Sequence, residues 1–323
     1  MRTRLSVTLS AGTDDVYNCL MAIALVGLGS NLGNREGALD RGVALLREEP
    51  GVHVTAVSGY RCSKPAGGPQ GQDDFLNAAA LLETSLSPET LLSVLQRIEE
   101  RIGRVRAERW GARAIDLDLL LVDRLELRSP TLELPHPRMG FRRFVLEPSA
   151  EIAPDLIWPV SGWTIRRLLE NLNTTPKYIA LGGLKSQRYR ETMTVLSRHA
   201  HIQTLSERPG SHAVQLLKSS SAKFDQWLVS DFWLEQSFAE WLLTRNPRPT
   251  STQINDWKRE AHSLIKPRLV ILDNSHVAAA PGSEEVQSHL RKLIRTGEVG
   301  PVIDVSSHAD VVAEVLAAMQ AME

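Results

Sequence analysis

Apolar residues in the first half of the chain follow patterns that predict alternating strands and helices. Apolar runs predict strands at residues 22–28, 53–60, 75–82, 114–122 and 144–146. Helical spacing predicts one helix after Asn31 or Asn34 and a second that begins at Ser87 and ends at Gly103. A further helix is expected at residues 164–172. The order βαββαβ predicts an α+β sandwich with the helices on one face of an antiparallel sheet.

The second half has a different pattern. Beyond a linker at residues 173–176, continuous apolar strands are expected at 178–181, 269–273 and 302–305, with helices from about 187 and over 309–322. Strands that are apolar throughout are typical of a parallel sheet buried on both faces. A length of 323 residues fits two domains. We therefore expect domains at 21–172 and 176–323, with 1–20 as a disordered extension or a start at Met21.

Composition narrows the function classes. The 37 Lys and Arg against 38 Asp and Glu give a net charge of −1, which argues against a nucleic-acid partner. Two cysteines exclude a disulfide framework and a cysteine-rich zinc site, and they suit a reducing cytoplasm. No apolar run approaches the roughly 20 residues of a membrane span. We expect a cytoplasmic protein that has no membrane partner.

Two carboxylates in one predicted strand are the strongest candidates for chemistry. Asp116 and Asp118 are two positions apart, so both side chains point to the same face of the strand. Such a pair can hold one or two Mg²⁺ ions against the phosphates of a nucleotide. The alternative is an exposed strand face with two solvated acids.

An arginine-rich loop leads directly into this strand, with Trp110 among its cations Arg104, Arg106, Arg109 and Arg113. Arginine stays charged and binds phosphate with two parallel hydrogen bonds. Cations beside a two-carboxylate strand are the parts that phosphoryl transfer needs. A solvated loop paired with Glu108 is the alternative, and it does not explain why the loop adjoins the aspartates.

Other residues have a structural and a functional interpretation. His136 lies between two prolines and is either structural or, beside Arg138, Arg142 and Arg143, a hydrogen-bond donor to phosphate. Asn77 in a strand interior is either a satisfied core amide or a group that recognises a ligand. Three aromatic residues are either core or a stacking slot for a heteroaromatic ring, namely Phe75, Trp110 and Phe144.

Residues 22 to about 170 resemble the 6-hydroxymethyl-7,8-dihydropterin pyrophosphokinase family of folate biosynthesis. The most specific stretch is Arg109-Trp-Gly-Ala-Arg-Ala-Ile-Asp-Leu-Asp118. The other matching stretches, in the same order along the chain, are 26–33, 67–69 with 75–78, 96–99, 103–106, 135–139, 142–146 and 151–155.

The resemblance implies a ferredoxin-like fold and a 2-amino-4-hydroxy-6-hydroxymethyldihydropteridine diphosphokinase, which transfers pyrophosphate from ATP to the pterin hydroxymethyl group. It implies that Asp116 and Asp118 bind two Mg²⁺ ions and that Arg104 and Arg113 act on the phosphates. It places ATP at Gln96, Glu99, Arg106, Arg109, His136 and Arg142. It places the pterin at Ser63, Pro65, Ala66, Phe75, Asn77, Trp110 and Phe144.

A few positions depart from the family pattern, all outside the charged set. Ala112 stands where the family usually has proline, and Gly140-Phe141 replaces a more polar pair. Glu147 and Ser149 replace apolar residues. We expect effects on loop stiffness and on the packing of the last strand, with the chemistry intact.

The second half faintly resembles an α/β P-loop domain of the deoxynucleoside-kinase type. Its phosphate loop is degenerate, because Gly182-Gly-Leu-Lys-Ser186 keeps Lys-Ser but is too short for the P-loop pattern. We therefore expect a non-catalytic domain that serves packing, partner binding or a homodimer. The alternatives are a bifunctional enzyme with a second, nucleoside kinase activity and a scaffold in which both halves have decayed.

Overall fold

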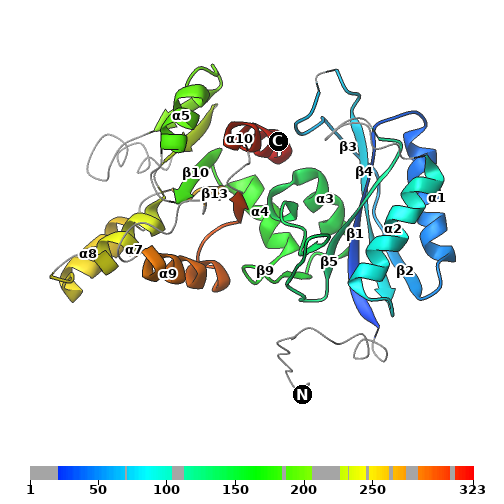
Figure 1. Cartoon of the computed structure of the whole chain (residues 1–323), viewed down its shortest axis with the longest axis horizontal. Coiled ribbons are helices and arrows are strands. Elements are labelled where there is room, and N and C mark those ends of the chain that lie inside the picture. The colour runs from blue at the N-terminus through cyan, green and yellow to red at the C-terminus, as the bar shows by residue number, and fades with distance from the viewer. Residues whose placement is uncertain are drawn as a thin grey trace.

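A computed structural model describes most of the chain beyond residue 20. The described residues are 21–69, 71–103, 113–183, 187–205, 226–231, 233–244, 247–261, 265–273, 283–305 and 310–323. The predictions for residues 1–20, for Arg104, Arg106, Arg109, Trp110 and Ala112, and for Lys185-Ser186 lie outside them. Two α/β units stand side by side, and the C-terminal helix α10 lies between them (Figure 1).

The first sheet is antiparallel, as predicted. Its strands are β1 (Ala22–Ser30), β2 (Val52–Val57), β3 (Arg61–Ser63), β4 (Phe75–Thr84) and β5 (Asp116–Val122). They follow the order β2-β4-β1-β5, and β3 also pairs with β4. The predicted strand at 53–60 is therefore wrong in extent, because the chain leaves the sheet between β2 and β3.

Two helices cover one face of this sheet. The helix α1 (Arg35–Glu48) begins after Asn34, whose side chain accepts a hydrogen bond from Gly37 N. The helix α2 (Pro88–Ile102) begins after Ser87 and ends at Gly103, whose φ of 102° suits glycine. Their apolar stripes pack on alternate residues of the strands, among them Ala24, Val26, Leu117 and Leu119.

Helices also cover the opposite face, so the prediction of helices on one face is wrong. A short turn η1 (Met139–Phe141) leads into α3 (Arg143–Ile152), and α4 (Ile165–Thr174) packs beside it. The predicted strand at 144–146 is the first turn of α3. Three consecutive residues do not distinguish a strand from a helix, whereas burial of Val145, Leu146 and Ser149 follows helical spacing.

Two small hairpins complete this half. The first pairs β6 (Leu127–Arg128) with β7 (Glu133–Leu134), and the second pairs β8 (Ile157–Trp158) with β9 (Trp163–Thr164). After β7 the Leu134–Pro135 peptide bond is cis. The backbone N–H of His136 then donates to Leu120 O, which fixes the next turn against β5.

The second sheet is parallel throughout, which confirms the prediction from its apolar strands. Its strands are β10 (Tyr178–Gly183), β11 (Ile202–Leu205), β12 (Trp227–Ser230), β13 (Leu269–Asp273) and β14 (Val302–Val305). Their order is β11-β12-β10-β13-β14. The described helices of this half are α5 (Gln187–Leu196), α7 (Leu234–Thr244), α8 (Ser251–Ala261), α9 (Ser283–Arg295) and α10 (Val311–Met322).

The two halves share one hydrophobic core. A single cluster joins Leu25 and Ala79 of the first sheet to Ile179 and Ile271 of the second. Helix α10 supplies Val315, Met319 and Met322 to this cluster and contacts both α3 and η1. The expected linker is short, since α4 ends at Thr174 and β10 begins at Tyr178. Within the described residues, no helix combines the length and apolar character needed to span a bilayer.

Candidate active site

A row of residues across the first sheet builds the floor of a cavity. The strand register places Gly29 of β1 between Asn77 of β4 and Asp116 of β5, and Gly27 directly opposite Asp118. Residues opposite one another project to the same face, so Asn77 and Asp116 lie roughly 10 Å apart across a strand that has no side chain at this point. A Cβ at Gly29 would stand 3.6 Å from Asn77 Oδ1, in this space. The glycines therefore keep the floor open.

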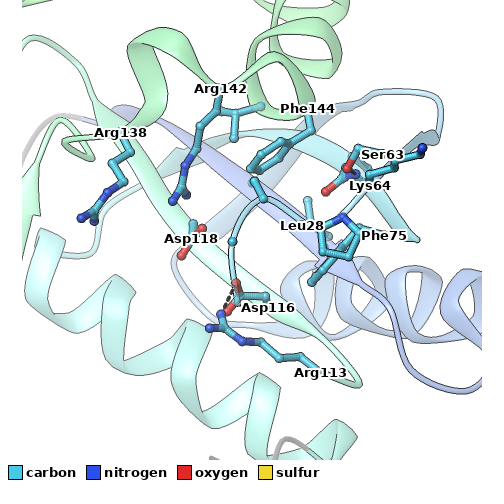
Figure 2. A pocket seen from close by; sticks show the side chains of 18 of the residues that line it. Leu28, Ser63, Lys64, Phe75, Arg113, Asp116, Asp118, Arg138, Arg142 and Phe144 are labelled. Carbon is cyan, nitrogen blue, oxygen red and sulfur yellow. Dashed lines mark hydrogen bonds and ion pairs between the residues drawn. The ribbon is translucent and has the colours of Figure 1, made fainter. Parts of the chain in front are cut away.

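Side chains from several elements surround an open cavity of about 220 Å³ above this floor. Figure 2 shows the aspartates on one side, Phe144 and Phe75 on another, and Arg138 and Arg142 beyond Asp118. The lining includes most of the described residues that the sequence predicted, namely Ser63, Pro65, Ala66, Phe75, Asn77, Arg113, Asp116, Asp118, His136, Arg142 and Phe144.

Asp116 and Asp118 both point into the cavity and are half-buried. Arg113 Nη1 donates to Asp116 Oδ2 at 2.5 Å, and this pair is drawn with a dashed line in Figure 2. The backbone of Arg113 is fixed in turn by Asn31, whose Oδ1 accepts from Arg113 N at 2.8 Å. The arginine that ends the loop is therefore placed beside the first carboxylate.

The aspartates fit a Mg²⁺ site that needs further oxygen ligands from a substrate. Their carboxylates share one face, and they line the same cavity as several cationic side chains. Among the residues that the structure describes, no cluster of three or more His, Cys, Asp or Glu side chains is placed to hold a metal. Mg²⁺ commonly takes one or two protein carboxylates together with phosphate oxygens and water, which matches this donor set.

His136, Arg138 and Arg142 form the cationic wall of the cavity. They come from the turn after β7 and the residue before α3. The guanidinium of Arg142 lies 5.5 Å from the centre of the Phe144 ring. In Figure 2 the side chain of Arg142 extends toward Asp118. Positive groups opposite two carboxylates suit a ligand that carries both a metal ion and phosphate groups.

His136 is neutral in this wall. Burial, together with the neighbouring charges of Arg142 and Arg138, lowers the pKa of His136 to about 3, although Asp116 acts to raise it. Nδ1 of this imidazole accepts a hydrogen bond from Arg138 N at 3.2 Å, so the proton of the neutral ring is on Nε2. His136 can therefore donate a hydrogen bond without adding a third charge to the wall.

The buried neutral histidine predicts a loss of stability in mild acid. Below about pH 6.5 the unfolded chain binds a proton at His136 that the folded chain does not bind until about pH 3, so the free energy of unfolding falls as pH drops. At pH 5 this amounts to about 2 kcal/mol. Urea denaturation at pH 7.5 and pH 5 should show a smaller pH effect for His136→Asn than for the unchanged chain. An identical pH effect in both would contradict the assignment.

An aromatic slot lies on the other side of the cavity. Phe75 begins β4 and Phe144 lies in the first turn of α3, and both rings face the cavity (Figure 2). Asn77 is buried nearby, and its Nδ2 donates to Ser63 Oγ at 2.9 Å and to Arg61 O at 3.2 Å. With Nδ2 held in this way, Oδ1 is left to accept a hydrogen bond at the edge of a planar ligand.

Two of the predicted nucleotide residues lie apart from the cavity. Gln96 and Glu99 are on α2 and are not among the described residues that line it. Glu99 is 2% exposed, and its Oε1 accepts a hydrogen bond from Leu117 N at 2.7 Å. The contact that the structure shows for Glu99 thus ties α2 to β5, directly between the two aspartates.

The site also contains residues that were not predicted for it. Arg138 lines the cavity, although in the sequence it stood only as a neighbour of His136. Lys64 and Gly67 line the opposite side. The predictive signal for Arg138 was the run of three basic residues after the proline turn. Its third member, Arg143, points elsewhere and donates to Asn173 Oδ1 and Met322 O.

Comparison with known proteins gives a consistent result for the first half. Residues 25–154 match the family described as 7,8-dihydro-6-hydroxymethylpterin-pyrophosphokinase. The chain is similar to proteins named 2-amino-4-hydroxy-6-hydroxymethyldihydropteridine pyrophosphokinase from several bacteria. That of Synechocystis sp. is 41% identical over 162 residues, which are 50% of this chain and 82% of the relative. That of Bacillus subtilis is 48% identical over 130 residues, 40% of this chain and 77% of the relative.

A third relative, from Methylorubrum extorquens, is 44% identical over 154 residues, which are 47% of this chain and 95% of the relative. That alignment leaves only 5% of the relative unmatched, so the relative has no counterpart of the second half of this chain. A solved structure of wild-type Plasmodium falciparum HPPK-DHPS aligns with 88% of this chain and 81% of its own length, at 10% identity and a TM-score of 0.37. A score this low does not establish a common fold.

Proposed function

The chain belongs to the 7,8-dihydro-6-hydroxymethylpterin-pyrophosphokinase family, and on this premise we propose the following reaction for it. It transfers pyrophosphate from ATP to the hydroxymethyl group of 6-hydroxymethyl-7,8-dihydropterin, in folate biosynthesis. The products are AMP and the pterin diphosphate. The observation that carries the proposal is one cavity lined by two carboxylates, several cationic or hydrogen-bonding side chains and two aromatic rings.

Asp116 and Asp118 hold two Mg²⁺ ions with the ATP phosphates in this proposal. Bound Mg²⁺ supplies neutralisation of phosphate charge as the pyrophosphoryl group moves. Arg113 donates a hydrogen bond to Asp116, so its guanidinium lies where it can also bind a phosphate oxygen next to this carboxylate. The sequence resemblance adds Arg104 to the same task and assigns Arg106 and Arg109 to holding ATP. Since phosphoryl transfer needs little covalent chemistry from the protein, positioning and charge are the main contributions of these residues.

ATP lies along the cationic wall, where His136 donates Nε2–H and Arg142 supplies its guanidinium. The pterin stacks between Phe75 and Phe144. Its further contacts are Ser63, Pro65 and Ala66, and Trp110 of the arginine-rich loop before β5 covers it. Both ligands then reach the cavity from opposite sides, and their reacting atoms meet above Gly27 and Gly29. The open floor that these glycines leave supports this arrangement.

Asn77 gives a test of the pterin side. Replacing Asn77 by Ala removes the acceptor at the ring edge, and we expect the KM for the pterin to rise by roughly tenfold or more. The KM for ATP should stay within about twofold of the unchanged chain, because Asn77 is across a strand from the aspartates. Steady-state kinetics with each substrate varied in turn measures both values. An equal rise in both KM values would mean that Asn77 acts by supporting the sheet.

The reaction itself is tested by supplying ATP, Mg²⁺ and hydroxymethyldihydropterin and following AMP. We expect AMP and pterin diphosphate in equal amounts. The absence of AMP from folded protein that binds neither ligand would contradict the proposal. The same assay with deoxynucleosides in place of the pterin tests the second candidate, a nucleoside kinase in the second half, for which ADP would be the product. The degenerate Gly182–Ser186 segment favours a non-catalytic second half.

A further inference from the structure

Helix α10 contacts residues that line the cavity of the first half. Its Glu314 makes a two-point contact with Arg138, with Arg138 Nη2 at 2.7 Å from Oε1 and Arg138 Nε at 3.3 Å from Oε2. The carboxylate is deeply buried, with 7% of the Glu314 side chain exposed, against 30% for Arg138. These residues are 176 positions apart in the sequence. The contact uses Nε and Nη2 of the guanidinium and leaves Nη1 for other partners.

Arg138 lies between two spaces. It lines the catalytic cavity with His136 and Arg142, and with Glu314 it also lines a second cavity of about 640 Å³ between the two halves. The second cavity is bounded by the β6–β7 hairpin on one side and β14 on the other. The Arg138–Glu314 pair therefore separates the two spaces, and an unrestrained Arg138 side chain has room to turn away from the catalytic cavity.

The charge of the neighbouring Arg142 explains why the Arg138 side chain needs the contact with Glu314. Arg138 and Arg142 line the same wall, and like charges in a half-buried site repel each other. The Glu314 carboxylate pairs with Arg138. Burial lowers the pKa of Arg142 and the charge of Arg138 also lowers it, whereas Glu314 acts in the opposite direction. Without Glu314, repulsion from Arg142 would drive Arg138 toward the second cavity.

The same helix contacts the pterin side of the cavity. Gln320, six residues after Glu314, accepts a hydrogen bond from Gly67 N at 2.8 Å. Gly67 lines the catalytic cavity in the loop that carries Pro65 and Ala66. Helix α10 therefore contacts the two sides of the site, at the cationic wall and at the loop beside the aromatic slot.

We propose that Glu314 is a positioning residue for Arg138, so that the second half of the chain completes the phosphate-binding wall of the first. Glu314 holds the Arg138 guanidinium at the catalytic cavity before ATP arrives, and Arg138 then binds an ATP phosphate oxygen through Nη1. This rests on the proposed function. It assigns to the second half a role in ATP binding that needs no chemistry of its own.

The test is a double-mutant cycle in the full-length chain. Glu314→Gln keeps the size of the side chain and removes its charge, and we expect the KM for ATP to rise by roughly tenfold. The turnover number and the KM for the pterin should stay within about twofold, because the lost interaction concerns ATP binding alone. In an Arg138→Ala background, Glu314→Gln should add less than about twofold, because the residue through which it acts is gone.

Glu323→Gln is the matched control. Glu323 lies at the end of the same helix and pairs with Lys177 and Trp227, away from the cavity, so its loss should leave both KM values unchanged. Three results would overturn the proposal: an unchanged or lower KM for ATP in Glu314→Gln, the same increase in the Arg138→Ala background, or an equal increase in Glu323→Gln. Lack of AMP formation by the unchanged chain would instead overturn the proposed function.

Discussion

Replacing Asp116 or Asp118 by Asn should lower the turnover number by about a thousandfold while the protein stays folded. Each substitution keeps the size of the side chain and removes one carboxylate from the cavity floor. Mg²⁺ contributes several kcal/mol to the stabilisation of transferring phosphate charge, and a loss of about 4 kcal/mol corresponds to this factor. The fold should persist, because the two side chains face the cavity and the core beneath β5 is made by Leu117 and Leu119.

Asp123 provides the matched control at the other end of β5. Its Oδ1 accepts a hydrogen bond from Ile23 N, far along the strand from the cavity, and its φ of 45° is one that Asn tolerates. Asp123→Asn should therefore retain turnover within about twofold. Circular dichroism and thermal unfolding check that each variant is folded. If the turnover number fell by less than tenfold in both cavity variants, the assignment of the metal ions to these two positions would be wrong.

Much of the first half could be predicted because its local signals agree with its tertiary packing. Asn34 and Ser87 cap α1 and α2 as their positions before the apolar stripes indicated. Alternation in residues 116–122 placed both aspartates on one face, and the register of β1 and β5 puts them in the cavity. In each case the deciding contact lies within one element or between neighbouring strands.

The prediction that helices cover only one face of the first sheet was wrong, and the sequence already held the evidence against it. A sheet with one solvent-exposed face alternates apolar and polar residues, whereas residues 22–28 are apolar or glycine throughout. Leu25 is fully buried on the face opposite Ala24 and Val26. That pattern already required a cover on both faces, and α3 with α4 provides it.

The role of the second half could not be predicted, because it depends on contacts between distant segments. Nothing near Glu314 in the sequence indicates Arg138. One indirect signal existed in Gly140-Phe141, where the family has a more polar pair. Phe141 is 2% exposed in the shared core, and a Cβ at Gly140 would stand 3.0 Å from the Trp158 ring. Apolar residues at this position suit a surface that the rest of the chain covers.

The shared core predicts that one charge placed in α10 will destabilise the whole molecule. Met319 is 3% exposed and belongs to the cluster that joins the two sheets, and α10 contacts α3 and η1. Met319→Asp buries a carboxylate without a partner, so we expect the free energy of unfolding to fall by about 4 kcal/mol. AMP formation should fall too, since η1 and the start of α3 lie between His136 and Phe144 of the cavity.

Met319→Leu separates the effect of charge from the effect of shape. The two side chains have similar volumes, so this variant should lose less than about 1.5 kcal/mol. Urea denaturation, followed by far-ultraviolet circular dichroism and by tryptophan fluorescence, measures both variants against the unchanged chain. If the halves were independent, Met319→Asp would shift only part of the transition. AMP formation would then persist, because the family match lies within residues 25–154. A single shifted transition with loss of activity instead requires that folding of the catalytic half depends on α10.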